Sequence, residues 1–211
     1  MTTVIDYGSG NLRSVAKALE TAGATLLVSS RAEDIQQADA LVLPGVGAFA
    51  DCHRNLTASG LVGPLLDHIQ SGKPFLGICV GMQLLFTEGH EFGIHPGLDL
   101  IPGKVVGFSK QMSDPAHPGT HLKSPHMGWN RIHLVKPHPL WQKISDKTHF
   151  YFVHSFHGVT KDPDTVAALC DYGISFPAAV AKENLFATQF HPEKSQTAGL
   201  QLLKNFVEWR P

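Results

Sequence analysis

The sequence predicts an α/β fold built on a mostly parallel sheet that helices cover on both faces. Two observations carry this prediction: short β-like runs alternate with helical patterns over the first 90 residues, and those runs are almost continuously apolar. Strands buried on both faces have this composition, and parallel neighbours need a helical crossover between them. With 211 residues and an apolar fraction of 43%, the chain can bury a large core, and we expect a single domain over residues 1–211.

The elements of the first half follow from apolar spacing and from the glycines beside it. Residues 3–6 form a short β-like run. The apolar residues of 12–22 then recur at helical spacing up to Gly23, and glycine often follows the last turn of a helix. The further elements predicted are strands at 24–29, 40–43 and 74–78, a helix at 56–69 and a helical stretch at 82–86.

The second half has a different character, because turn-rich segments instead of helices separate its β-like runs. Such spacing predicts antiparallel strands added to the sheet. Residues 109–124 are polar and rich in Pro, Gly and His, and we expect an exposed loop there. The elements predicted are strands at 104–108, 129–134, 149–153, 166–170 and 178–181, a last strand ending at 188–190, and a helix at 195–209.

Charge and composition argue against several classes of function. The net charge is −1, the isoelectric point is near 6.9 and no basic block is present, so we expect neither nucleic acid nor a membrane surface as a partner. Met1–Asp6 has no signal-like pattern, and no apolar run reaches the ~18 residues of a spanning helix. Cys52, Cys79 and Cys170 are odd in number and lack CxxC spacing, which indicates free thiols in a reducing compartment. We therefore expect a cytoplasmic protein.

The stretch Gly77–Gln83 places the thiol of Cys79 between two glycines, where a predicted strand gives way to a helical pattern. The pattern G-x-C-x-G is typical of a nucleophile elbow, a turn sharp enough to expose a side chain at the end of a strand. A helix N-terminus favours a thiolate, and the free N–H of Val80 would face a developing oxyanion. On this stretch alone, a small core cysteine is an equal alternative.

A nucleophilic thiol needs a base and a group that orients the base, and the segment Phe190–Glu193 supplies both. Residues i and i+2 of an extended segment point to the same side. The Glu193 carboxylate can therefore hold one nitrogen of His191 while the other nitrogen faces Cys79. An H-x-E pair is a weak signal in a chain with 13 histidines, but with the elbow it completes a set of nucleophile, base and orienting carboxylate.

The loop Pro44–Gly47 follows the preceding strand and carries two glycines. Because ligands bind beyond the carboxyl ends of parallel strands, we expect this loop beside the Cys79 elbow. Its glycines would let backbone N–H groups turn toward an anion or a carbonyl oxygen. An ordinary tight turn is an equal alternative here.

Other features carry less information. Gly8 and Gly10 are followed by Arg13 where a dinucleotide fingerprint has its third glycine, so we expect no dinucleotide cofactor. Cys52 and Cys170 are expected to be bystanders. We expect no metal site, because several histidines lack a convincing ligand spacing; these are His117, His121, His126, His133 and His138.

Together the motifs resemble those of class I (triad-type) glutamine amidotransferases. The resemblance rests on P-G-V-G at 44–47, G-I-C-V-G-M-Q at 77–83 and Q-F-H-P-E at 189–193. It runs from the first predicted strand to the last helix and implies a flavodoxin-like three-layer α/β/α sandwich. More specific segments are similar to the glutaminase subunits of imidazole glycerol phosphate synthases; these are D-Y-G-S-G-N-L at 6–12, H-M-G-W-N at 126–130, Y-F-V-H-S at 151–155 and H-P-E-K-S at 191–195.

The resemblance implies a mechanism and a set of site residues. Cys79 would attack the side-chain amide of glutamine, with His191 as base and then acid and with Glu193 holding the imidazole. A glutamyl thioester would follow and would be hydrolysed to glutamate. The resemblance also implies an oxyanion hole whose loop reorients when the partner is liganded, and contacts to the substrate; these involve Gly45, Val46, Gly47 and Val80 for the oxyanion, and Gln83, Ser155 and Phe156 for glutamine.

The resemblance further implies a partner and no cofactor. Ammonia would pass, shielded from water, to a (β/α)₈ cyclase subunit in a heterodimer. That subunit would make imidazole glycerol phosphate and an aminoimidazole carboxamide ribotide, in histidine biosynthesis. Asn11, Met127, Trp129 and Lys194 would lie at the interface between the two subunits.

Two other classes compete with a partner-dependent amidotransferase. A stand-alone cysteine hydrolase or peptidase would share Cys79 and a histidine but has no need of Gln83 or of H-P-E-K-S. A non-enzymatic flavodoxin-like binding module would use Cys79 for packing alone. Labelling of Cys79 by a glutamine-like electrophile separates the amidotransferase from both.

Overall fold

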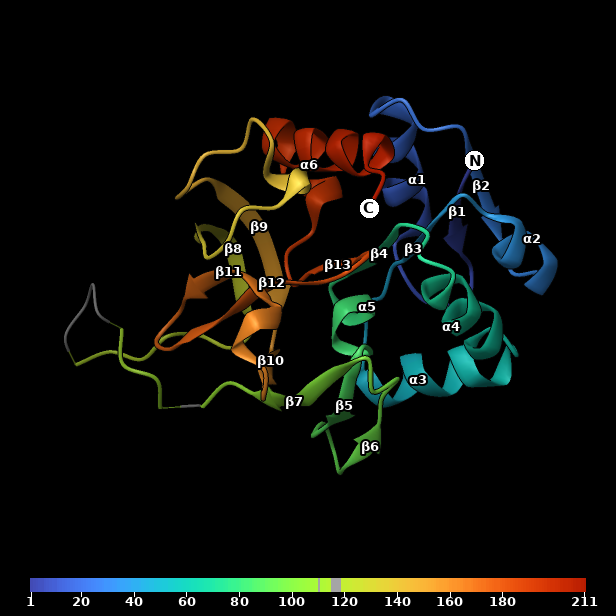
Figure 1. The fold of residues 1–211 in the computed structure, drawn as a ribbon. Coiled ribbons are helices and arrows are strands. Elements are labelled where there is room, and N and C mark those ends of the chain that lie inside the picture. Colours follow the sequence, from blue (N-terminus) through green and yellow to red (C-terminus); the bar gives the residue numbers. More distant parts are fainter. Residues whose placement is uncertain (110, 115–118) are drawn as a thin grey trace.

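The computed structural model describes residues 1–109, 111–114 and 119–211 (Figure 1). Within these residues, nine strands form one mixed sheet in the order β2-β1-β3-β4-β13-β12-β11-β8-β9. Four further strands form a second, smaller sheet in the order β10-β7-β5-β6. The parallel and antiparallel halves of the large sheet meet at β13, which lies at its centre although it comes from the last part of the chain.

The parallel half contains strands whose residues are largely buried. β3, β4 and β13 are buried along their whole length, which explains why they form continuous apolar runs in the sequence. All neighbours in this half pair in parallel, as predicted. The strands are β2 (Leu26–Ser29), β1 (Thr2–Ile5), β3 (Ala40–Leu43), β4 (Phe75–Ile78) and β13 (Leu185–Thr188).

The antiparallel half confirms the prediction that the second part of the chain extends the sheet. Each strand from β12 to β9 pairs antiparallel with its neighbour, and β12 pairs antiparallel with β13. The strands are β12 (Ser175–Lys182), β11 (Val166–Asp171), β8 (His126–Leu134) and β9 (His149–His154).

Helices cover both faces of the large sheet. α1 (Leu12–Thr21) and α6 (Gln196–Glu208) pack together on one face (Figure 1). α2 (Ala32–Gln37), α3 (Phe49–Ala58) and α4 (Val62–Gln70) lie on the other face. This layering of helix, sheet and helix confirms the predicted fold class. None of the helices in the described part of the chain is long and apolar enough to cross a membrane.

The predicted helix at 56–69 is two helices in the structure. α3 ends at Ala58, and the turn that follows contains Gly60 with φ +72° before α4 begins. A left-handed glycine of this kind stops a helix, because it satisfies the last carbonyls without the penalty that a Cβ would bring. The sequence does not predict α2, because Ile35 is buried there among polar residues and no apolar stripe results.

The predicted helical stretch at 82–86 is correct only for Met82 and Gln83. α5 covers Val80–Gln83, and Phe86 already begins β5, which pairs in parallel with β7. Phe86 is fully buried, so pairing with a distant strand overrides the local apolar spacing. The second sheet is not predicted as a separate sheet, although the strand predicted at 104–108 overlaps its β7. Its strands are β10 (Phe156–Thr160), β7 (Ile101–Gly107), β5 (Phe86–Gly89) and β6 (His95–Pro96).

The polar segment 109–124 is described only in part. Its described residues contain an isolated bridge between Ser113 and His121 and no helix. Residues 110 and 115–118, including His117, lie outside the described residues. The remaining short turns are 3₁₀ helices: η1 (Pro139–Trp141), η2 (Pro163–Thr165) and η3 (Pro192–Lys194).

Candidate active site

Cys79 lies at the sharp turn between β4 and α5, at the carboxyl end of the parallel strands. Its φ of 55° and ψ of −110° are strained for a residue with a Cβ, and strain of this kind concentrates at functional sites. Its backbone N–H donates to the carbonyl of Thr188 at 2.7 Å, which ties the elbow to β13. The predicted nucleophile elbow is therefore present in the fold.

The glycines around Cys79 let two backbone segments approach each other closely. A Cβ on Gly81 would lie 2.0 Å from the carbonyl oxygen of Leu43, well inside contact distance. A Cβ on Gly45 would lie 2.7 Å from the backbone nitrogen of Gly81. The elbow and the loop after β3 are thus pressed together, as their positions at neighbouring strand ends require.

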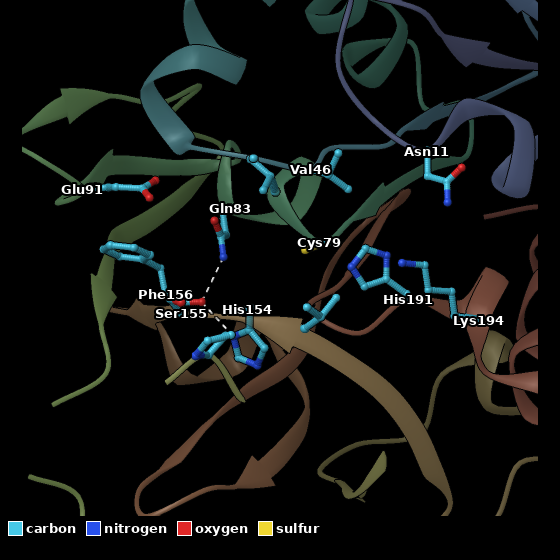
Figure 2. Close-up of a pocket in the computed structure, with 14 residues that line it drawn as sticks. Asn11, Val46, Cys79, Gln83, Glu91, His154, Ser155, Phe156, His191 and Lys194 are labelled. Carbon is cyan, nitrogen blue, oxygen red and sulfur yellow. Dashed lines mark hydrogen bonds between the residues drawn. The ribbon is translucent and has the colours of Figure 1, made fainter. Parts of the chain in front are cut away.

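His191 and Glu193 follow β13, the strand next to β4. The register pairs Thr188 with Ile78, so the elbow thiol and the imidazole leave adjacent strands at the same level. His191 Nδ1 lies 2.8 Å from Glu193 Oε1, and both side chains are buried. Since the carboxylate accepts, Nδ1 carries the proton that it donates. Nε2 is buried without a hydrogen-bond partner among the described residues, and the imidazole lies beside Cys79 at the pocket (Figure 2).

The surroundings of His191 keep its ring protonated. Burial lowers the pKa of His191, but the negative charges of Cys79 and Glu193 outweigh it and raise the pKa to about 10. An imidazolium beside a thiolate is the reactive form of a cysteine nucleophile with its acid and base. The structure therefore brings the three residues of the predicted set together at the cavity.

Gln189 is a polar contact of Cys79 to which the sequence assigned no role. Its side chain is fully buried, and its Nε2 donates to Cys79 Sγ at 3.7 Å. Its Oε1 accepts from Gln83 Nε2 at 3.1 Å. Gln189 lies two residues before His191 on the same extended segment, and this spacing is the sequence signal that points to it.

A cavity of about 510 Å³ opens in front of Cys79 (Figure 2). It is large enough for a small polar substrate. No group of three or more His, Cys, Asp or Glu within the described residues is placed to hold a metal ion. The residues that line the cavity are Asn11, Val46, Gly47, Cys79, Val80, Gln83, Glu91, Pro125, Val153, His154, Ser155, Phe156, His191 and Lys194.

The far side of the cavity has polar groups that can hold a zwitterion. Gln83 Nε2 donates to the carbonyl of Phe156 at 3.0 Å, so the amide is oriented and its Oε1 remains an acceptor. Glu91 is the only carboxylate among the described residues that line the cavity, and its Oε2 accepts from the N–H of Phe49 at 2.6 Å. The sequence does not point to Glu91. With a helix predicted up to residue 86, the strand β5 that carries the chain back to the cavity could not be foreseen.

The loop Pro44–Gly47 lies against the elbow, as predicted. The Gly45–Val46 peptide, however, turns its carbonyl and not its N–H toward the N–H of Val80. The N–H of Val80, expected to be free, donates to the carbonyl of Gly45 at 3.3 Å. The peptides on either side are held: Tyr7 donates to Pro44 O, and Ser9 donates to Val46 O, each at 2.8 Å. The Gly45–Val46 peptide therefore covers the predicted oxyanion donor in this structure.

The four residues expected at a partner interface separate into two groups. Asn11 and Lys194 line the cavity, and the Lys194 ammonium lies 5.8 Å from the centre of the Tyr151 ring. Met127 and Trp129 on β8 do not line it, but their side chains are 62% and 46% exposed. Met127 and Trp129 are thus exposed on β8, outside the cavity.

The sequence of the whole chain matches a known family. The profile of the family described as glutamine amidotransferase class-I matches residues 3–209. The chain belongs to this family. Enzymes of this family characteristically use a catalytic triad and a thioester intermediate, and the chain has the fold that the sequence predicts.

Full-length relatives of this amidotransferase have one name in common. A protein of Syntrophotalea carbinolica is 54% identical over 206 residues, with 98% of each chain covered. One of Geobacter sulfurreducens is 49% identical over 207 residues, again with 98% of each chain covered. Both are named imidazole glycerol phosphate synthase subunit HisH.

Solved structures share the fold of this amidotransferase at lower identity. A structure titled as a glutamine amidotransferase superposes with a TM-score of 0.72 at 18% identity, covering 98% of this chain and 97% of the other. The structure of PurLQS from Thermotoga maritima gives a TM-score of 0.69 at 18% identity, covering 98% and 95%. These likenesses concern the fold alone.

Proposed function

We propose that this amidotransferase is the glutaminase subunit of an imidazole glycerol phosphate synthase. The observation that carries the proposal is the buried Cys79–His191–Glu193 set at the head of a cavity sized for one amino acid. The name shared by relatives at about half identity over the whole chain supports the choice of synthase.

The reaction begins with attack of the Cys79 thiolate on the side-chain carbonyl carbon of glutamine. A C–S bond forms, and the electron pair of the C=O bond moves to oxygen. His191 then gives its Nε2 proton to the amide nitrogen, the C–N bond breaks and ammonia leaves. A water molecule, deprotonated by the now neutral His191, hydrolyses the thioester to glutamate and restores the thiolate.

The substrate lies with its amide at Cys79 and its α-carbon groups at the far side of the cavity. The free Oε1 of Gln83 and the carboxylate of Glu91 accept hydrogen bonds from the α-ammonium group. The backbone of Ser155 and Phe156 holds the α-carboxylate at the start of β10. A zwitterion needs acceptors for its ammonium group and donors for its carboxylate at fixed places, and these groups can supply both.

The oxyanion hole forms when the Gly45–Val46 peptide rotates. Rotation moves the Gly45 carbonyl away and releases the N–H of Val80, while the N–H of Val46 turns toward the cavity. Gly47, with φ +100°, absorbs part of the change on the far side of the loop. Each oxyanion donor contributes about 10²–10³ in rate, so the enzyme is slow until the loop turns.

The partner is a (β/α)₈ cyclase subunit that forms a heterodimer with this chain and receives the ammonia. The exposed Met127 and Trp129 on β8, with Asn11 and Lys194 at the cavity, make up the face that it covers. In the complex the cyclase uses the ammonia to make imidazole glycerol phosphate and an aminoimidazole carboxamide ribotide. The three free cysteines agree with a place in the cytoplasm.

A glutamine-like diazoketone or chloro-isoxazoline tests the catalytic part of the proposal. We expect one adduct by mass spectrometry, on Cys79, and none on the Cys79→Ala variant. The buried Cys52 and Cys170 are internal controls, because they lie outside the cavity. Labelling absent from Cys79 in both the free and the partner-bound protein overturns the proposal.

Activation by the partner tests the choice of synthase. We expect glutamine hydrolysis to be slow in the free chain and to rise by about 10²–10³ or more when the cyclase and its nucleotide ligand are added, because one oxyanion donor alone supplies about 10²–10³. High constitutive activity of the free chain would contradict both the partner dependence and the loop rotation.

A further inference from the structure

Two buried histidines outside the triad join the glutamine cavity to strand β8. His126 on β8 and His154 at the end of β9 are 2% and 6% exposed. Nδ1 of His126 lies 3.0 Å from Nε2 of His154. His154 also lines the cavity, whereas His126 lies one strand further from it.

The hydrogen-bond partners fix where each ring carries its proton. His154 Nδ1 lies 2.8 Å from the carbonyl of Phe156, which can only accept, so Nδ1 is the protonated nitrogen. His154 Nε2 is then an acceptor, and His126 Nδ1 donates to it. His126 Nε2 accepts in turn from Nδ2 of Asn130 at 3.2 Å, and the same amide donates to the carbonyl of Asp171 at 2.9 Å. All four ring nitrogens are thereby used, with both rings neutral.

The rings around this pair favour neutral imidazoles. His126 stacks on Phe152 and on Tyr172, with ring centres 4.9 and 4.0 Å away. Phe176 lies against both histidines. Burial lowers the pKa of His126 to about 4 and that of His154 to about 3. A neutral pair in this surrounding can keep a single hydrogen-bond direction.

The chain of hydrogen bonds ends on the groups that hold the substrate. The Phe156 carbonyl accepts from His154 Nδ1 and also from Gln83 Nε2, and Figure 2 shows the two bonds converging on it. Gln83 donates to Gln189 as well, and Gln189 donates to Cys79. The direction of the Gln83 amide, with Oε1 left for the substrate, therefore depends on where the Phe156 carbonyl points.

We propose that His126 and His154 are positioning residues of the glutamine site, which fix the Phe156 carbonyl and through it the Gln83 amide. This inference rests on the proposed function, since it assumes that Gln83 and the 155–156 backbone bind glutamine. A packing role alone would need no matched donor and acceptor on every ring nitrogen. The hydrogen bond from His154 Nδ1 fixes the Phe156 carbonyl. The hydrogen bond from His126 to His154 Nε2 keeps the His154 proton on Nδ1, where the first bond needs it.

Substitution of His154 by Asn or by Gln tests its two hydrogen bonds one at a time, because each amide side chain can replace only one of the two ring nitrogens. The Asn amide nitrogen stands in for Nδ1, and the end of a Gln side chain stands in for Nε2. His154→Asn keeps the donor to Phe156, whereas His154→Gln keeps a partner for His126 and loses that donor. We expect His154→Gln to raise the KM for glutamine about five- to tenfold, the cost of one hydrogen bond, and His154→Asn to raise it less than twofold.

The same pair of substitutions at His126 tests the next hydrogen bond of the network. His126→Asn keeps the donor to His154, and we expect little change in KM. His126→Gln loses the donor and leaves His154 Nε2 unpaired, and we expect a two- to fivefold rise in KM. The matched control is His157→Gln, because His157 packs in the same aromatic cluster but bonds the local carbonyl of Gly158. It is expected to lower stability with KM unchanged.

All measurements use the complex with the cyclase partner, and glutamine binding is also measured by calorimetry in the Cys79→Ala background. A misfolded fraction lowers kcat but leaves KM and Kd as they are, so the readout separates positioning from stability. Equal KM and Kd values for His154→Gln and His154→Asn, or a shift with His157→Gln as large as with His154→Gln, overturn the proposal. Nitrogen NMR of the wild-type rings gives a second readout: His154 must show a proton on Nδ1 and none on Nε2, and a charged ring or the other tautomer would contradict it.

Failure of the proposed function has a different signature. If the wild-type complex neither hydrolyses glutamine nor is labelled at Cys79, the functional proposal fails as a whole. If the wild type is active and labelled while the four variants share its KM, only the role of the histidine pair is wrong.

Discussion

At the scale of single residues, His191 is protonated before the reaction starts. Its pKa of about 10 follows from burial, which lowers it, and from the stronger opposing charges of Cys79 and Glu193. In the proposed mechanism, the proton that the leaving ammonia needs is therefore already on the ring at neutral pH. Glu193 holds the ring through Nδ1, which leaves Nε2 as the only nitrogen that can deliver the proton.

Glu193→Gln tests this reading of the triad. The amide keeps the shape of the side chain but removes the charge that raises the pKa of His191, so the pKa falls. We expect kcat in the partner complex to fall about 10²–10⁴-fold, and the alkaline limb of the kcat profile to move to lower pH. Steady-state kinetics between about pH 6 and pH 10 measure both effects. An unchanged limb would mean that Glu193 does not set the charge of His191.

Glu91→Gln is the matched change of charge at the other end of the cavity. In the proposed pose Glu91 binds the α-ammonium group, away from the bond that breaks. We expect the KM for glutamine to rise about tenfold or more because an ionic hydrogen bond is lost. kcat should change much less than in Glu193→Gln. A loss confined to kcat would place Glu91 in the chemistry and contradict its role in binding.

At the scale of elements, the tightest contact of the site lies between α5 and the end of β3. Gly81 has no room for a methyl group, since its Cβ would lie 2.0 Å from the carbonyl of Leu43. That oxygen belongs to the backbone of a buried strand and cannot move aside cheaply. The close approach of the elbow to the end of β3 therefore requires a glycine at position 81, as it requires one at position 45 on the other side of the contact.

Gly81→Ala should lower the free energy of unfolding by about 3 kcal/mol or more and remove glutaminase activity, because the elbow must shift away from β3. The control is Gly63→Ala in α4, where a Cβ meets nothing within 4 Å. There we expect a change of less than about 1 kcal/mol in either direction, since alanine favours a helix over glycine but Pro64 disfavours a Cβ on the residue before it. Urea unfolding of both variants checks the contrast, and equal losses would show that the contact at Leu43 is not the cause.

Elements and residues with a local signal could be predicted from the sequence. β3, β4 and β13 are buried apolar runs, and Cys79 stands between the glycines of an elbow. Features that depend on pairing between distant segments could not be predicted. β5 starts at Phe86 because it pairs with β7, and nothing in the sequence of either strand indicates that the two pair. The state of the Gly45 carbonyl is likewise invisible, because a glycine-rich loop permits both orientations of that peptide.

At the scale of the whole molecule, buried histidines make stability depend on pH. The pKa values of His126 and His154, lowered by burial to about 4 and about 3, lie below the ordinary 6.5 that both have in the unfolded chain. The unfolded chain thus binds protons first as the pH falls. The stability that the neutral rings contribute is complete above about pH 6.5 and is lost as the pH drops toward 4 and 3.

We expect the free energy of unfolding to fall between about pH 6.5 and pH 4.5 by about 1.4 kcal/mol per pH unit for each of these two histidines. His191 does not add to this loss, because its raised pKa gives a contribution that is complete below about pH 6.5 and is lost only as the pH rises toward 10. Urea unfolding at a series of pH values measures the slope. His154→Gln should reduce the slope by the contribution of one proton, about 1.4 kcal/mol per pH unit. An unchanged slope would contradict a lowered pKa of His154.

The central position of β13 has a consequence for the synthesis of the protein. The thiol of Cys79 is made early, but its base, its carboxylate and Gln189 all lie in the segment 189–193 that follows β13. That strand pairs with β12, which directly precedes it in the chain, and with β4, which is made about a hundred residues earlier. In a nascent chain on the ribosome, Cys79 therefore lacks its proposed base and carboxylate. We expect no glutamine to be consumed, and no ammonia to be released, until translation has passed residue 193.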